Sequence, residues 1–232
     1  MDNQYHYPGS ELETFESAIN WKKYMAEKIR PFIKGDVMEI GAGLGSSSKI
    51  LDQGEAHSWT LLEPDAGMYE HLKKNLSGFH AHTKVQQGTV KDVQQQFDTI
   101  LYIDVLEHIE DDKTELELAS NRLNAGGHLV VFSPAFHSLY SEFDRAIGHV
   151  RRYDKKKLKQ ISPNNMKLIL MRHLDSVGFF ASMMNRLALH QEYPTKNQIR
   201  FWDSKLVPVS RITDRFFSSW FGKTILAVWE KQ

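Results

Sequence analysis

The chain has 232 residues with 29 basic and 29 acidic side chains, so its formal net charge is zero. This balance excludes a uniformly basic nucleic-acid coat protein and an acidic disordered tail. The charges are nevertheless unevenly placed. Residues 1–144 hold 12 Lys and Arg against 23 Asp and Glu, a net −11, whereas residues 145–232 hold 17 against 6, a net +11.

The remaining composition is that of a globular protein, with 41% hydrophobic and 25% charged residues. The absence of cysteine excludes disulfides, thiol catalysis and Cys-ligated zinc. There is no signal-peptide pattern and no apolar run of the ~18–20 residues that a spanning helix needs. We therefore expect a soluble, cytoplasmic protein, with peripheral contact at the inner membrane face as the alternative.

The first predicted element is a helix from Glu11 to Arg30, which Pro31 ends. Its apolar residues recur at steps of three and four, as expected of one buried helix face. They are Ala18, Trp21, Met25 and Ile29.

Short apolar runs then alternate with helical segments. The predicted strands are Val37–Ile40, Trp59–Leu62, Thr99–Ile103, His128–Phe132, Lys167–Met171 and Ile225–Trp229. The predicted helices are Ser46–Asp52, Asp65–Leu76 and Asp112–Leu123, the last with a capping pair, Asp112 and Glu115, and Gly126 as its stop. Strands that alternate with helices indicate a doubly wound parallel α/β sheet. Its ligand should lie beyond the carboxyl ends of the strands.

A glycine-rich turn follows the first strand, in the segment Val37-Met-Glu-Ile-Gly-Ala-Gly-Leu-Gly45. Such a turn brings backbone N–H groups close to a ligand. The dinucleotide fingerprint requires glycine at position 46, where this chain has Ser46, so a pyrophosphate cradle is poorly matched. Glu39 would repel a phosphate but could pair with an ammonium group. A tight turn without a ligand is the structural alternative.

An acidic residue, Glu63, ends the second predicted strand 22 positions after Gly41. This offset is close to the roughly 20 residues that separate a glycine loop from a carboxylate binding ribose hydroxyls. A solvated strand end is the alternative. With the glycine loop in place, the spacing favours ribose binding.

Five blocks in this order resemble the class I S-adenosylmethionine-dependent methyltransferases. They are Glu39–Gly45, the strand end at Glu63, Gln87–Val90, Tyr102–Ile109 and Leu123–Pro134, which together cover about residues 36–135. Two further segments, Phe143–Tyr153 and Asn20-Trp21-Lys22, are similar to a bacterial subgroup of this family whose acceptors are mostly unassigned.

The resemblance implies a Rossmann-like, seven-stranded sheet, mostly parallel with an antiparallel last strand, preceded by an N-terminal helix. We expect a single domain. Its parts would be an N-terminal helix (10–30), a cofactor-binding core (36–135), an acceptor loop (136–160), a helical cap inserted before the last strand (174–222) and that strand (223–230).

The resemblance also implies residues that bind S-adenosylmethionine. Glu39, Gly41, Ala42, Gly43 and Gly45 would hold its methionine part, Glu63 its ribose, and Pro64, Met68, Thr89 and Val90 its adenine, while Asp104 and Val105 would close over the methionine side. Many relatives have Asp where this chain has Thr89, and Asp92 is the possible substitute. The cofactor carries an ammonium and a sulfonium group but no phosphate, which suits Glu39 and Asp104. Methyl transfer needs alignment and exclusion of water but no metal, and the sequence shows no strong metal-ligand cluster.

The acceptor should enter after the fifth core strand, near Ser133–His137. The candidate catalytic residues are His149, which is the best candidate for a base because histidine commonly serves as one in enzymes, with Asp144 and Arg145. Asp144 and Arg145 could equally form an ion pair that fixes the loop. The candidate substrate contacts are His108, His137, Arg151, Arg152 and Tyr153.

Two features leave alternatives open. Tyr153-x-x-x-Lys157 has the spacing of short-chain dehydrogenases, which keeps an NAD-dependent oxidoreductase under consideration, although a lysine-rich run makes a chance match easy. The cap combines aromatic residues with arginines, which could bind bases, lipid or an anionic substrate, or could form the cap's own small core.

The sequence thus predicts a methyltransferase for a small, sugar-linked or lipid-linked, anionic acceptor. A non-catalytic cofactor-binding or membrane-docking protein is the alternative outside enzymology. Nucleic-acid methylation is disfavoured, because the strand end reads Ile103-Asp104-Val105-Leu106 rather than Asn/Asp-Pro-Pro-aromatic. The pattern does not predict the oligomeric state.

Overall fold

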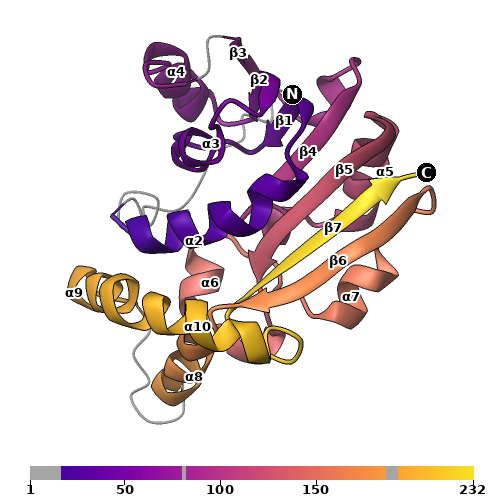
Figure 1. The fold of residues 1–232 in the computed structure, drawn as a ribbon. Helices are drawn as coiled ribbons and strands as arrows, with labels where there is room; N and C mark the ends of the chain where they lie inside the picture. Colours follow the sequence, from indigo (N-terminus) through magenta and orange to yellow (C-terminus); the bar gives the residue numbers. More distant parts are fainter. Residues whose placement is uncertain (1–16, 80–81, 187–192) are drawn as a thin grey trace.

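The structure is a computed structural model that describes residues 17–79, 82–186 and 193–232. Within these residues, seven strands form one sheet with helices on both faces (Figure 1). The part of the predicted N-terminal helix before residue 17 lies outside the described residues.

The sheet has the strand order β3-β2-β1-β4-β5-β7-β6. Strand β7 runs antiparallel to both β5 and β6, while β1 to β5 pair in parallel. The strands are β1 (Gly35–Ile40), β2 (Ala56–Glu63), β3 (Thr83–Gln87), β4 (Phe97–Ile103), β5 (Leu123–Pro134), β6 (Met166–Leu174) and β7 (Thr224–Lys231). This topology confirms the predicted fold class.

The α-helices among the described residues are α2 (Ile19–Ile29), α3 (Ser46–Leu51), α4 (Ala66–Lys74), α5 (Asp112–Asn121), α6 (Glu142–Ala146), α7 (Lys155–Gln160), α8 (Ser176–Met184), α9 (Lys196–Phe201) and α10 (Val207–Phe217). Short 3-10 turns are η1 (Arg30–Phe32), η2 (Val90–Asp92), η3 (Leu106–His108) and η4 (His137–Leu139), and η6 (Trp202–Leu206) is a π-helical turn. No described helix is long and apolar enough to span a lipid bilayer.

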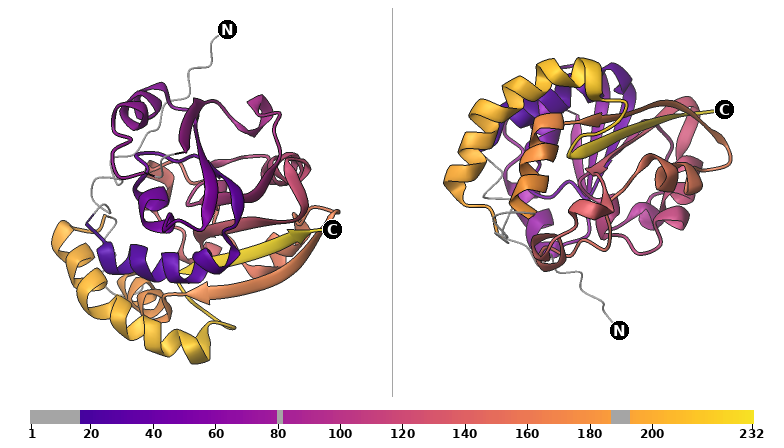
Figure 2. Two further views of the ribbon diagram at one scale, coloured as in Figure 1. Left: turned by 45° about the horizontal axis from the view of Figure 1, so that its top comes forward. Right: turned by 90° about the horizontal axis from the view of Figure 1, so that it is seen from below.

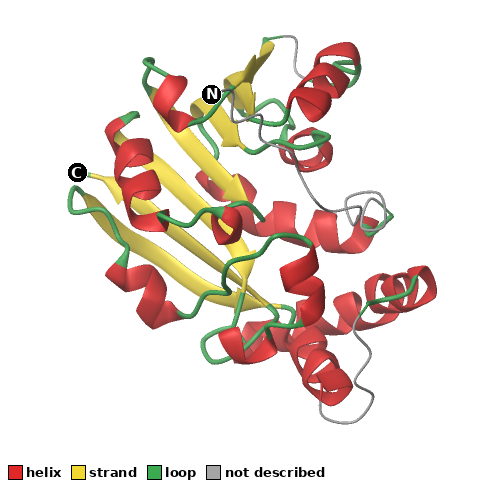
Figure 3. Ribbon diagram, turned by 180° about the vertical axis from the view of Figure 1, so that it is seen from behind, coloured by secondary structure: helices red, strands yellow, loops and turns green. Residues whose placement is uncertain are grey.

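Two hydrophobic clusters bury the two faces of the sheet, because successive strand residues point to opposite sides. Val37 packs with α2, α3 and Val207 of α10 on one face. Its neighbour Met38 packs with α5 and α7 on the other. Figure 1 looks onto the first face and Figure 3 onto the second. Both faces are covered, as expected of a doubly wound sheet.

Two local predictions were wrong and one strand was missed. Strand β3 (Thr83–Gln87) was not predicted, because its residues are largely polar and only half-buried at the sheet edge. Helix α5 is capped one residue earlier, by Asp111, whose side chain accepts from the Thr114 N–H at 3.1 Å. Leu123 begins β5 rather than ending that helix, so that Gly126 lies within a strand and is not a helix stop.

The segment between β6 and β7 forms a helical layer beside α2. Helices α9 and α10 are joined by the π-helical turn η6, and α10 packs against both α8 and α2 (Figure 2). We call the described residues 176–186 and 193–221 the cap. It follows the carboxyl end of β6 and precedes the start of β7, so both of its ends lie at one edge of the sheet.

Three buried aspartates fix the cap. Asp203 accepts from the backbone N–H groups of Asn20 and Trp21 at 3.2 and 2.8 Å, which places a side-chain cap on α2 from 182 residues away. Asp214 accepts from Tyr24 Oη at 2.8 Å, and Asp175 accepts from Trp202 Nε1 at 2.7 Å. The N-terminal helix and the cap are therefore tied together by hydrogen bonds.

Candidate active site

The predicted site residues gather at one edge of the sheet. Strands β1, β2, β4 and β5 are parallel, so the segments that follow them meet at their carboxyl ends. Strand β7 starts at this same edge, since Thr224 pairs with Pro134. The edge thus carries the glycine turn, Glu63, Asp104 and Lys223.

The glycine turn is hydrogen-bonded to β2 and lies against the segment after β4. The N–H groups of Gly41 and Ala42 both donate to the Leu62 carbonyl, at 2.8 and 3.1 Å. Gly41 has a φ of +65°, and a Cβ atom there would lie only 2.7 Å from the Val105 Cγ2 atom. Glycine is therefore required at this position both by conformation and by space.

Glu63 supports the turn from β2. Its carboxylate is 3% exposed and accepts from the Gly43 N–H at 2.7 Å and from the Asp65 N–H at 2.9 Å. Burial raises its pKa, and the two backbone hydrogen bonds oppose that rise. A carboxylate has about four lone-pair sites, so two remain beyond these backbone hydrogen bonds. Pro64 and Met68 are half-buried beside it.

Glu39 lies deeper than the other acidic residues of the turn. Its side chain is 2% exposed and accepts a short hydrogen bond from the Ser48 hydroxyl. Burial raises its pKa to about 7. A cationic group brought close to it would therefore favour its charged form.

The predicted adenine contacts lie after β3. Thr89 is exposed, and Asp92 Oδ2 accepts from both its N–H and its hydroxyl, at 2.8 and 3.0 Å. These hydrogen bonds lower the pKa of Asp92. Val90 is fully buried in the core. The alternative hydrogen-bond acceptor for adenine, Asp92, is thus placed at this edge but is already bonded to Thr89.

Asp104 ends β4 in an unusual backbone conformation. Its φ is +53°, which is uncommon for a residue other than glycine, and its N–H donates to the Phe132 carbonyl at 2.8 Å. Solvent reaches the Asp104 side chain, but the surrounding protein desolvates it enough to raise its pKa to about 6. The charges of His149 and Lys223 oppose this rise. Strain of this kind is typical of functional sites.

Asp144 and His149 form a buried hydrogen-bonded pair. Asp144 Oδ1 lies 2.9 Å from His149 Nδ1, and Arg152 makes a two-pronged ion pair with the same carboxylate at 2.8 and 2.9 Å. These contacts hold the pKa of Asp144 well below its usual range, although burial alone would raise it. The ion pair fixes the His149 ring and leaves its Nε2 atom directed away from Asp144.

Arg145 is not part of this arrangement. It pairs with Glu142 on the surface, where its side chain is 66% exposed. The predicted ion pair between Asp144 and Arg145 is therefore wrong, and Arg152 is the partner of Asp144. Arg145 lies on helix α6, one residue after Asp144, and points away from the buried pair.

Glu107 and His108 lie against His149. Glu107 is fully buried, and its carboxylate makes no hydrogen bond of good geometry with a described residue, although the Ser133 hydroxyl and the charge of Arg152 act to lower its pKa. His149 Nε2 lies 3.8 Å from Glu107 Oε1, and the His108 and His149 ring centroids are 4.7 Å apart. Burial, followed by the charge of Asp104, raises the pKa of Glu107, whereas burial lowers the pKa of His108 to about 4.

Of the other predicted substrate residues, Tyr153 and Arg151 serve the fold. Tyr153 is buried in the core, and its hydroxyl donates to Asp112 at 2.9 Å. Arg151 pairs with the same Asp112 at 2.5 Å. A catalytic Tyr-Lys pair is thus excluded for Tyr153. His137 is exposed, with its ring 5.1 Å from that of Tyr140.

Lys223 was missed by sequence reasoning. It precedes β7, and its charge interacts with the carboxylates of Asp104, Asp144 and Asp175. Burial lowers its pKa, and its ammonium group lies 5.1 Å from the centre of the Trp202 ring. A lone lysine before a predicted strand carries no sequence signal, because its neighbours are brought in by the fold.

Comparison with known proteins agrees with this geometry. Residues 38–129 match the family model described as a methyltransferase domain. None of the curated proteins matches the chain significantly in sequence.

Solved structures share the fold at low sequence identity. A chain from the complex of the Haloferax volcanii Trm112 methyltransferase activator with a provisionally described methyltransferase is 13% identical, with a TM-score of 0.63 over 95% of this chain and 91% of that one. An S-adenosylmethionine-dependent methyltransferase from Clostridium acetobutylicum is 11% identical, with a TM-score of 0.59 over 93% and 92%. The N-methyltransferase NodS from Bradyrhizobium japonicum, in complex with S-adenosylhomocysteine, is 13% identical, with a TM-score of 0.58 over 93% and 88%.

These structural matches establish the fold. The family match covers residues 38–129 with a methyltransferase domain, in agreement with the class predicted from the ordered sequence blocks. The roles of the individual residues remain predictions.

Proposed function

We propose that the enzyme methylates an anionic, lipid-linked acceptor that reaches the carboxyl edge of the sheet beside His149. The observation that carries this proposal is the proximity of two arrangements. The glycine turn, Glu63 and Asp104 form one, and the buried Asp144–His149 pair forms the other. The first suits a cofactor with an ammonium and a sulfonium group, and the second suits an acceptor.

In this proposal the acceptor attacks the methyl carbon in line with the carbon–sulfur bond, whose electrons pass to sulfur and leave a neutral thioether. Glu39, the backbone of Gly41 to Gly45 and Asp104 hold the methionine part, while Glu63 accepts from the ribose. NodS binds S-adenosylhomocysteine on the same fold, which supports this placement. The residues position the two reactants and exclude water, which supplies most of what such a reaction needs.

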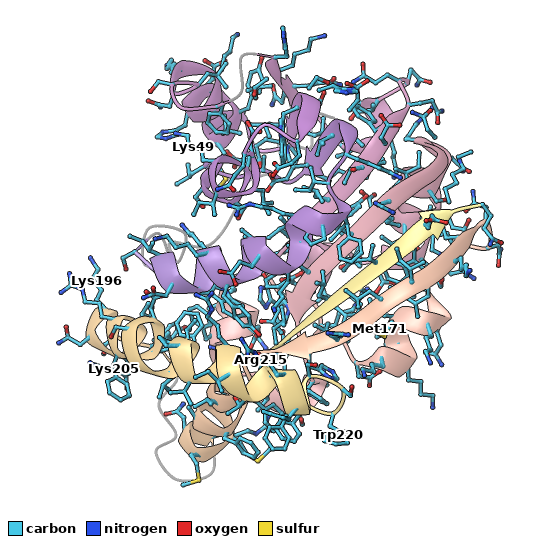
Figure 4. The ribbon with its side chains drawn as sticks, viewed as in Figure 1. Lys49, Met171, Lys196, Lys205, Arg215 and Trp220 are labelled. Carbon is cyan, nitrogen blue, oxygen red and sulfur yellow. The ribbon has the colours of Figure 1, made fainter. Side chains whose placement is uncertain are left out.

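The cap favours a lipid-linked acceptor. Phe216 and Trp220 are 70% and 66% exposed, and Ile212 extends the same side of α10. Arg215 lies on α10 and Lys205 on the π-helical turn η6, and Trp220 lies in the turn that follows α10 (Figure 4). Exposed aromatic residues beside basic ones suit an anionic lipid surface. Phe179, Phe217 and Phe221 instead stack on one another as a small aromatic core.

A radiolabelled methyl group tests the proposal. Incubation of the enzyme with labelled S-adenosylmethionine and a bacterial lipid extract is expected to move the label into the organic phase, and a His149→Ala variant is expected to lose this transfer while still binding S-adenosylhomocysteine. Label in the aqueous phase alone would overturn the lipid-linked acceptor. No transfer to any acceptor, with cofactor binding intact, would contradict the proposed reaction.

A further inference from the structure

Three potential metal ligands converge next to the transfer site. Glu107, His108 and His149 each offer one ligand atom, and these atoms all lie within 4.8 Å of one another. Glu107 and His108 come from η3 after β4, and His149 follows α6. The sequence did not suggest this set, because His149 lies 41 positions after His108.

We infer that Glu107, His108 and His149 bind a divalent metal ion beside the transfer site, and that this ion takes an oxygen of the acceptor. The first part stands on the geometry alone. The second part rests on the proposed function. The residues would supply two imidazole nitrogens and one carboxylate oxygen, and coordination positions would remain open for the acceptor.

Glu107 gives the most direct support. Its side chain is fully buried without a hydrogen bond of good geometry from any described residue, which is costly for a carboxylate. Buried charges in proteins are paired or coordinate metals. His149 Nε2 is 3.8 Å from Glu107 Oε1, too far for a hydrogen bond, and the charge of Arg152 also acts on this carboxylate. A bound ion would satisfy both atoms at once.

Both histidines have the second contact expected of metal ligands, which usually donate their other ring N–H to a carboxylate or a carbonyl. His149 Nδ1 lies 2.9 Å from Asp144 Oδ1. His108 hydrogen bonds to the backbone of Gly148. His149 thus keeps Nε2, the nitrogen nearer Glu107, for an ion, and each ring has a second contact of the kind that orients a ligand.

The distances suit a small ion. Two ligands that each lie about 2.1 Å from one ion can be at most about 4.2 Å apart, and the 3.8 Å between Glu107 and His149 falls within this limit. All three ligand atoms lie within 4.8 Å of one another, so the third ligand must move closer when an ion binds. Imidazole with carboxylate favours Zn²⁺, Fe²⁺ or Mn²⁺ over Mg²⁺.

The ion would change the role of His149 from free base to ligand. An acceptor hydroxyl that coordinates the ion would lose its proton to water more readily, because the positive charge lowers its pKa. The resulting oxygen anion would then attack the methyl carbon, and the electrons of the carbon–sulfur bond would pass to sulfur. Asp144 and Arg152 act here as positioning residues.

Titration of chelator-treated enzyme with Mn²⁺ and Zn²⁺, followed by calorimetry, tests the inference. We expect one ion per chain and a loss of at least about a hundredfold in affinity for Glu107→Gln and His149→Ala, because each removes one of three ligands. Asp144→Asn should weaken binding by about 10- to 100-fold. His71→Ala, on the exposed face of α4, is the matched control and should bind like wild type.

A second measurement, Co²⁺ spectroscopy, uses only the wild-type enzyme and so does not depend on whether the variants fold. Co²⁺ added to the wild-type enzyme should give visible ligand-field bands that excess Zn²⁺ removes. Absence of these bands, or binding unchanged in both ligand variants, would overturn the inference. Affinity for S-adenosylhomocysteine is measured on the same samples. If no metal binds but the cofactor product does, the metal site is wrong and the proposed function stands. If metal binds but the cofactor product does not, the proposed function is wrong and the metal site stands.

Discussion

Single residues decide whether the turn after β1 can accept a ligand. Gly41 combines a left-handed backbone with a Cβ direction blocked by Val105, while Glu63 holds the Gly43 N–H in place. The pattern of glycines predicted the turn, but the contact with Val105 could not be predicted. It depends on how the segment after β4 is placed beside β1.

Replacing Gly41 by alanine should weaken S-adenosylhomocysteine binding by at least about tenfold, since the left-handed conformation alone costs an alanine about 1–2 kcal/mol and the added Cβ must displace Val105. Calorimetry measures the affinity. Gly54→Ala is the matched control, because its φ is also positive, at +94°, but no atom lies within 4 Å of the added Cβ. Equal affinity in both variants would show that the turn does not approach the cofactor.

His173 should make the fold sensitive to acid. It is 3% exposed, its ring stacks on Phe136, and neither ring nitrogen has a hydrogen-bond partner among the described residues. Burial lowers its pKa to about 4, with Lys155 adding to this and Asp154 opposing it. The unfolded chain therefore binds a proton between about pH 6.5 and 4 that the folded chain does not, so this contribution to stability is present above pH 6.5 and is lost as pH falls.

His173→Phe should remove on the order of 3 kcal/mol of the loss in unfolding free energy between pH 7 and pH 4, at about 1.4 kcal/mol for each pKa unit. Urea unfolding at the two pH values measures it. An unchanged pH dependence would mean that His173 is protonated in the folded state at low cost.

Buried polar contacts at the acceptor side were only partly predictable. The sequence suggested that Asp144 would pair with a neighbouring arginine and that His149 would lie in the same loop. In the structure, an arginine and His149 both contact Asp144. The choice of Arg152 over Arg145 depends on α6, which turns Arg145 outward. Glu107 lies in the segment Tyr102–Ile109 that resembles the family, but its burial and its lack of a well-formed hydrogen bond depend on the fold and cannot be predicted from that segment.

At the scale of elements, the strands with continuous apolar runs were predicted well, and the exceptions have physical reasons. Strand β3 lies at the sheet edge, so polar residues are tolerated there and the hydrophobic signal is weak. Helix α5 ends before Leu123 because that residue pairs with Phe97 of β4. Pairing between distant strands overrides the local helical pattern.

The helix α2 depends on the cap for its N-terminal hydrogen bonds. Its own N-cap residue, Ala18, provides no side-chain acceptor, and Asp203 supplies one instead. Loss of such a cap costs about 0.5–2 kcal/mol, and unpaired buried N–H groups add to that.

Asp203→Ala should therefore lower the free energy of unfolding by about 1–3 kcal/mol and loosen α2 and the cap together. Denaturant unfolding measures the first effect and amide hydrogen exchange the second. Glu55→Ala, at an exposed position far from the cap in sequence, is the control. Faster exchange confined to the cap, with α2 unchanged, would contradict the long-range capping.

For the whole molecule, the charge asymmetry coincides with the division between core and cap. The acidic first part contains β1 to β5, around which the cationic cofactor is expected to bind. The basic second part contains α7 and the cap, which carries the exposed aromatic residues. Net zero is thus the sum of two opposite charges with different proposed ligands.

This division predicts binding to anionic vesicles that weakens at high salt, because screening reduces the attraction between exposed charges. Sedimentation with anionic and with neutral vesicles measures it. A Phe216→Ser, Trp220→Ser double variant should bind at least about tenfold more weakly, since each side chain would bury apolar area in the lipid. The control is Gln53→Ser, at an exposed position outside the cap, which should sediment like wild type. Equal sedimentation of the double variant and wild type would contradict the role of this face.

Calorimetric titration of the enzyme with S-adenosylmethionine, S-adenosylhomocysteine and NAD tests the central claim most directly, because the glycine turn departs from the dinucleotide fingerprint at Ser46. We predict saturable binding of S-adenosylmethionine and S-adenosylhomocysteine at one site per chain, weakened in Gly41→Ala, and no binding of NAD. Binding of NAD without binding of either methionine compound would contradict the account.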